Sequence, residues 1–65
     1  MIRLTKLNGV QFILNCELIE TIEQTPDTII STTNGKKFVV TETIEKIVEK
    51  VLWYKRKIYL FKDEE

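Results

Sequence analysis

The 65-residue sequence has no histidine, one cysteine, one proline and two glycines. A single thiol, Cys16, cannot close an intrachain disulfide, and a zinc site needs several cysteine or histidine ligands. Two glycines, both in predicted turns, are too few for a glycine-rich phosphate loop. Without histidine, the chain also lacks the side chain that most often serves as a base near neutral pH. We therefore expect no metal, no cofactor and no enzyme active site, and we interpret Cys16 as a small core or turn residue.

The chain is also short. A domain of this length buries only about 60% of the surface that its unfolded chain exposes. Natural scaffolds of this size are usually supported by disulfides, a metal or a partner subunit. With the first two excluded, self-association or unusually good packing is the expected support.

The charge has no excess of either sign. Ten lysines and arginines balance ten aspartates and glutamates, so no strong field steers the molecule to nucleic acid or membrane. No apolar run approaches the roughly 18 residues of a membrane-spanning helix. The N-terminal "MIRLTKLNG" lacks the long apolar region of a secretory signal. We expect a cytoplasmic protein without membrane insertion.

What the sequence does contain is the same turn signal twice. Asn-Gly precedes an apolar run in "LNGVQFIL" at residues 7–14 and again in "TNGKKFVV" at residues 33–40. Asn-Gly between apolar runs is the strongest local hairpin signal, since a type I′ turn needs positive φ at both central positions. Two-residue loops would join strands at residues 2–7 and 10–14, and at residues 28–33 and 36–40.

That register divides the apolar side chains between the two faces of the strands. It places Thr5 beside Phe12 and Leu4 beside Ile13. One face then carries Phe12, Leu14, Ile29, Phe38 and Val40, and the other carries Leu4, Ile13, Ile30 and Val39. One helix can cover only one of these faces, so the other needs closure into a small barrel or a second copy of the chain. We favour a homo-oligomer.

The remaining segments complete the predicted topology. Residues 18–25 read as a strand, provided that a bulge or short helical turn near Glu17 corrects the phase of the alternation. After Val40 the apolar period changes to that of a helix, with Thr43 as N-cap. Its expected buried stripe, which ends near residues 54–56, consists of Ile44, Ile47, Val48, Val51 and Leu52.

The predicted fold class is therefore α+β: a small antiparallel five-stranded meander, with two Asn-Gly hairpins, followed by one C-terminal amphipathic helix. A single domain is expected over residues 1–62, with a frayed acidic tail at residues 63–65.

Trp53 is the strongest candidate for a binding residue. On a helical wheel it lies opposite the apolar stripe, among charged side chains. Either another part of the chain covers it, or it anchors an interface, because tryptophan and arginine dominate interface hot spots. Arg56 and Leu60 are the further interface candidates. The expected partners are other proteins, including a second copy of this chain.

RNA binding is the alternative. Basic and aromatic residues alternate in "WYKRKIYLF", and two lysines lie at a hairpin tip, an arrangement that can pair phosphates and stack bases. Basic residues at a helix C-terminus also complement the helix dipole, and the net charge is zero. The candidate phosphate contacts are Lys36, Lys37, Lys55, Arg56 and Lys57.

The residues also resemble a known family. The opening "I-x-L-T-x-L-N-G", then "L-N-x-x-L-I-E-x-I-E-x-T-P-D-T" and "T-N-G-K-K-F-V-V", are similar to the small flagellar FlbD-type proteins, which include the swarming-motility SwrD group. The resemblance extends to about Ile58 and departs at Asn15 and Cys16, so it assigns no role to that thiol. It implies a cytoplasmic accessory factor that raises flagellar motor power through the stator units, with no catalytic site to carry over.

The order of five strands and a helix is also similar to that of the CsrA-type carbon-storage regulators, which bind messenger RNA as intertwined dimers. This second likeness is one of architecture and not of motif, and architecture alone does not imply function.

Overall fold

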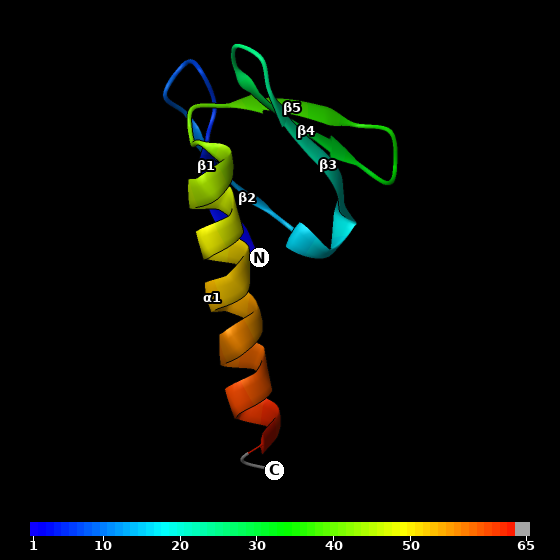
Figure 1. Cartoon of the computed structure of the whole chain (residues 1–65), viewed down its shortest axis with the longest axis vertical. Coiled ribbons are helices and arrows are strands. Elements are labelled where there is room, and N and C mark those ends of the chain that lie inside the picture. Colours follow the sequence, from blue (N-terminus) through cyan, green and yellow to red (C-terminus); the bar gives the residue numbers. More distant parts are fainter. Residues whose placement is uncertain (64–65) are drawn as a thin grey trace.

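The computed structural model describes the backbone of residues 1–63 and the side chains of residues 1–58, so residues 64–65 of the predicted tail lie outside it. Five antiparallel strands precede one helix (Figure 1), which confirms the α+β class. The elements are β1 (Ile2–Thr5), β2 (Gln11–Leu14), the 3-10 turn η1 (Cys16–Leu18), β3 (Ile19–Gln24), β4 (Thr28–Thr32), β5 (Lys37–Val40) and α1 (Ile44–Asp63).

The strands form two sheets. β1 pairs with β2, and β3, β4 and β5 form the second sheet in that order. Within residues 1–63, β2 and β3 do not pair, because η1 turns the chain between them. Of the bulge and the short helical turn that the sequence allows near Glu17, the structure has the helical turn there, and the register of β3 and β4 also shifts between Ile19 and Thr21. The sheets meet where Lys6 bridges Val40 and where the Thr41 N–H donates to the Thr5 carbonyl at 2.9 Å.

Both Asn-Gly hairpins form, but each has a three-residue loop, and the predicted two-residue loops are wrong. In the first, the Lys6 N–H donates to the Val10 carbonyl and the Gly9 N–H donates to the Lys6 carbonyl, both at 2.9 Å. Among the described residues only Gly9 and Gly35 have positive φ, at 89° and 83°. A type I′ turn is thereby excluded, and a type I turn followed by a left-handed glycine remains.

The second hairpin repeats this geometry. The Thr32 N–H donates to the Lys36 carbonyl at 2.9 Å, and the Gly35 N–H donates to the Thr32 carbonyl at 3.0 Å. The Thr32 side chain is buried and accepts from the Lys36 N–H at 3.2 Å. Each loop therefore holds one residue more than the sequence predicts, and each strand pairing shifts by one residue.

The shifted register corrects the predicted two-sided sheet. Leu4 pairs with Phe12 and not with Ile13, and Ile30 pairs with Phe38 and not with Val39. Because side chains alternate with a period of two, paired residues share a face and a one-residue shift moves an apolar residue across the sheet. Leu4 and Ile30 thus join the two phenylalanines on the inner face.

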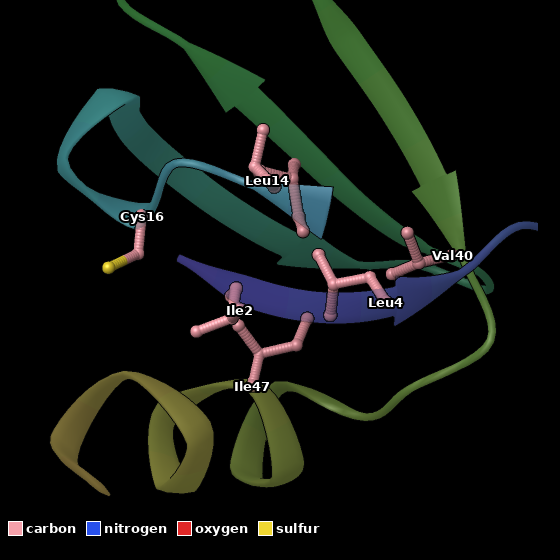
Figure 2. Close-up of a cluster of buried hydrophobic side chains, with 7 residues drawn as sticks. Ile2, Leu4, Leu14, Cys16, Val40 and Ile47 are labelled. Atoms are coloured by element: carbon pink, nitrogen blue, oxygen red, sulfur yellow. The ribbon is translucent and has the colours of Figure 1, made fainter. Parts of the chain in front are cut away.

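The core lies between the two sheets and the first half of α1 (Figure 2). Leu4, Ile30, Val40 and Ile47 are almost completely buried. Across the sheets, the rings of Phe12 and Phe38 stack with centroids 5.3 Å apart. The buried cluster is Ile2, Leu4, Leu14, Cys16, Ile30, Val40 and Ile47, so Cys16 is a core residue, as expected.

Hydrogen bonds fix the start of α1. The Lys46 N–H donates to the Thr43 Oγ1 at 3.2 Å, which confirms the predicted N-cap. The Ile44 N–H donates to the Gln24 Oε1 at 3.2 Å, and the Thr5 N–H donates to the Glu42 Oε1 at 3.0 Å. The helix N-terminus is therefore bonded to both sheets.

The buried face of α1 is narrower than predicted. Ile47 is fully buried, and Val51 and Tyr54 pack partly buried against the core. Val48 and Leu52, which the sequence assigns to the buried stripe, are 44% and 62% exposed. The two small sheets cover one narrow line of the helix, and these two residues lie to one side of it.

Candidate interaction surface

The C-terminal half of α1 extends beyond both sheets (Figure 1). A helix from Ile44 to Asp63 is about 30 Å long, since each residue adds about 1.5 Å. The whole molecule measures 42 × 23 × 19 Å, so the helix accounts for most of its long axis. At the level where α1 leaves the body, Lys55 forms an ion pair of 3.7 Å with Glu17 of η1. A helix that extends from the body exposes side chains on several faces.

Trp53 is the most prominent of these side chains. It is 61% exposed, on the face where the helical wheel places it. The ammonium group of Lys57 lies over its ring, 4.5 Å from the ring centroid. Its neighbour Leu52 is equally exposed. A large aromatic residue and a leucine therefore lie side by side in water.

Two hollows lie beside Trp53. The first, which we call the N-terminal cleft, has a volume of about 380 Å³. It lies between the start of β1 and the outer face of α1 and is lined by Met1, Ile2, Arg3, Lys46, Glu49, Lys50 and Trp53. Three cationic side chains face one carboxylate there, and the apolar parts of the wall come from both elements. The N-terminal cleft therefore suits a segment that is both apolar and acidic.

The second hollow, which we call the helix groove, lies on α1 itself. Its volume is about 470 Å³, and it is lined by Glu49, Leu52, Trp53 and Arg56. Of the three predicted interface residues, the structure thus brings Trp53 and Arg56 together. The side chain of the third, Leu60, lies outside the described residues.

Leu52 and the start of β1 are parts of this surface that the sequence did not reveal. Leu52 was assigned to the core because it continues the apolar stripe. One feature of the sequence indicates that Leu52 is exposed. The apolar stripe is wider than the part of the helix surface that a sheet of four- to six-residue strands can cover. Nothing in the sequence indicates that residues 1–3 belong to this surface, since their position beside Trp53 arises only from the tertiary fold.

The five basic residues of the RNA alternative do not gather on one surface. Lys36 and Lys37 lie at the turn between β4 and β5, on a different side of the molecule from the C-terminal half of α1 (Figure 1). Lys55 is paired with Glu17, and Lys57 lies over Trp53. Two of the three α1 residues in this set, Lys55 and Lys57, therefore have contacts within the protein.

Two observations concern the titratable groups of the described residues. No three cysteine, aspartate or glutamate side chains converge as a metal site in this part of the chain. Burial by itself raises the pKa of Glu42, but hydrogen bonds from Thr5 and the charge of Lys50 outweigh it, so the pKa of Glu42 is lowered. This carboxylate joins β1 to the start of α1, which gives it a structural role.

The geometry defines a small α+β protein with two short sheets and an exposed C-terminal helix. No helix among the described residues has the length and apolarity needed to cross a membrane. The sequence profile of the FlbD family of flagellar and swarming motility proteins matches residues 1–59, so the chain belongs to this family. The match confirms the family that the sequence motifs indicated. Comparisons with curated proteins and with solved structures give no match. Membership of this family assigns the protein a role in flagellar and swarming motility.

Proposed function

We propose that the protein is a non-enzymatic, cytoplasmic accessory factor of the flagellum that acts by binding another protein at the surface around Trp53. Family membership supports the role in motility. The observation that supports the binding role is the 61% exposure of Trp53 between two hollows. Tryptophan gives large contact area at low entropic cost and is enriched among interface hot spots.

The partner in this proposal binds the N-terminal cleft with an acidic and apolar segment. Arg3, Lys46 and Lys50 favour carboxylates, while Met1, Ile2 and the Trp53 ring favour apolar side chains. Charge complementarity of this kind sets the rate of association and the choice of partner more than the final affinity. A component of the flagellar motor is the first candidate, and the resemblance to the swarming-motility group directs attention to the stator units.

Two substitutions test this proposal in motile cells. Trp53→Ala removes the anchor, and Lys46→Glu reverses one charge of the N-terminal cleft. Both are expected to reduce swarming and to lower the recovery of flagellar proteins in an affinity pull-down by at least about tenfold, which is roughly 1.4 kcal/mol of binding free energy. Lys37→Glu makes the same change of charge on β5 and serves as the matched control.

Normal swarming and an unchanged pull-down in both variants, at wild-type protein levels, would refute the proposal. RNA binding would replace it if the purified protein formed a salt-sensitive RNA complex that was lost when Lys36, Lys37, Lys55, Arg56 and Lys57 were all replaced. We predict no such complex.

A further inference from the structure

The charged and apolar residues that line the helix groove are arranged so that the groove is complementary to a second copy of itself. Its lining consists of one acidic residue, two apolar residues and one basic residue, in that order along α1: Glu49, Leu52, Trp53 and Arg56. We propose that this groove is a self-association surface, in which the α1 helix of a second copy docks antiparallel to the first. This inference goes beyond the proposed function and does not rest on it.

Charge complementarity identifies the second copy as the occupant. Glu49 and Arg56 are about two helical turns apart, roughly 10 Å along the axis, on either side of Leu52 and Trp53. A two-fold axis between Leu52 and Trp53 places Glu49 of each copy beside Arg56 of the other. It also brings the two pairs of apolar side chains together at the centre. A two-fold interface requires a patch that is complementary to itself, and this groove has that property.

The position of the groove leaves room for a second helix. At about 100° per residue, the four groove residues centre roughly 180° around the helix from Ile47, Val51 and Tyr54, which pack against the core. A second α1 on this side therefore packs against α1 on the face opposite the core, and the start of β1, which lies beside Glu49 and Trp53, borders the contact. Helices that pack in this way lie about 8–10 Å apart.

The two lysines that this register places level with each other nearest the two-fold axis do not oppose the pairing. In the antiparallel register Lys50 stands across from Lys55, but neither residue lines the groove. Lys50 faces the N-terminal cleft, and Lys55 is paired with Glu17 of its own copy. The like charges are therefore turned away from the contact.

The size of the surface sets the expected strength. A stable interface buries about 800 Å² on each partner, more than four side chains supply. Such a small contact favours a weak, reversible dimer with a Kd in the micromolar range or above. A chain of 65 residues with neither disulfide nor bound metal in its described core gains support from such a pair.

The test is a charge exchange measured by sedimentation equilibrium from about 1 µM to 1 mM, a range that spans the expected Kd. Glu49→Arg and Arg56→Glu each place like charges across the two-fold axis, and each is expected to raise the Kd at least tenfold. The double variant exchanges both charges and is expected to restore dimerisation. An equimolar mixture of the two single variants is expected to form a mixed dimer, since arginine then faces glutamate at both contacts.

Asp27→Arg, the same reversal of charge in the turn between β3 and β4, is the matched control and is expected to leave the Kd unchanged. All replaced side chains are exposed, and far-UV circular dichroism checks that the variants fold. A wild-type protein that stays monomeric at 1 mM would overturn the proposal, as would a dimer that is indifferent to both single variants or a double variant that stays monomeric. In the motility assay, Trp53→Ala alters both hollows, whereas Lys46→Glu changes a residue of the N-terminal cleft that does not line the helix groove, so Lys46→Glu distinguishes the two proposals.

Discussion

Replacing Trp53 by alanine is expected to leave the protein folded, although tryptophan is the largest side chain in the sequence. The indole is 61% exposed, and its close contact is with the Lys57 ammonium, 4.5 Å from the ring centroid. An exposed cation–π contact contributes about 0.5–1 kcal/mol. The variant should therefore lose no more than about 1 kcal/mol of the free energy of unfolding.

Ile47→Ala provides the contrast on the same helix. Ile47 is 0% exposed in the middle of the core, so its truncation removes buried apolar surface and leaves a cavity. Substitutions of this kind cost about 2–5 kcal/mol. A domain of this length rarely has more than about 3–5 kcal/mol of total stability, so the variant should be close to unfolding.

Urea titration followed by far-UV circular dichroism measures both variants without depending on the fluorescence of the tryptophan that is removed. The reasoning requires a large difference between the two midpoints, with Trp53→Ala near wild type. A loss of more than about 2 kcal/mol in Trp53→Ala would show that the indole is packed against the core. That result would refute the assignment of Trp53 to an exposed binding surface.

Two further predictions test the hairpins and the start of α1. Leu7→Pro should be neutral or stabilising by about 0.5 kcal/mol, because Leu7 is the second residue of a type I turn, a position that favours proline. In the equivalent position of the other hairpin, Thr33→Pro should destabilise, because the Thr33 N–H donates to the Leu18 carbonyl at 2.8 Å. In urea titrations, a clear loss of stability in Leu7→Pro would contradict the type I turn, and a neutral Thr33→Pro would contradict the Thr33–Leu18 hydrogen bond. Glu42 has a lowered pKa, so its stabilising effect is fully present above its ordinary value of 4.5 and is lost as the pH falls through the lower folded value. Glu42→Gln should therefore reduce stability at pH 7 by about 1 kcal/mol and flatten the acid side of a stability–pH profile, and an unchanged profile would exclude this role.

Local chemistry explains which parts of the fold the sequence predicted. The Thr43 N-cap, the helical turn at Glu17 and the two Asn-Gly turns depend on neighbouring residues, and all are present. The loop length was missed because Asn-Gly fits both a two-residue type I′ loop and a type I turn followed by a left-handed glycine. The choice between these two turn geometries depends on how the hairpin strands pair and pack with the rest of the protein, which the turn residues alone do not specify.

The error in register had consequences for function. It placed Leu4 and Ile30 on the face opposite Phe12 and Phe38, and so predicted that the strands have apolar surface on both faces, of which the helix covers one. In the structure these two side chains are buried. Ile13 and Val39 stay exposed on the strands, and the exposed large apolar side chains among the described residues of α1 are Val48, Leu52, Trp53 and Ile58. The wheel placed Trp53 correctly because helical geometry is local. The N-terminal cleft was not predictable, because it depends on how β1 packs beside α1.

The most direct test of the binding surface is site-specific photocross-linking in motile cells. A photoreactive amino acid at position 53 is expected to form a covalent adduct with a flagellar protein other than this chain, identified by mass spectrometry and distinguished there from an adduct with a second copy. The same amino acid at Lys37 is expected to give none. Adducts of equal yield at both positions, or an adduct at position 53 only with proteins unrelated to the flagellum, would contradict the proposed role of the Trp53 surface.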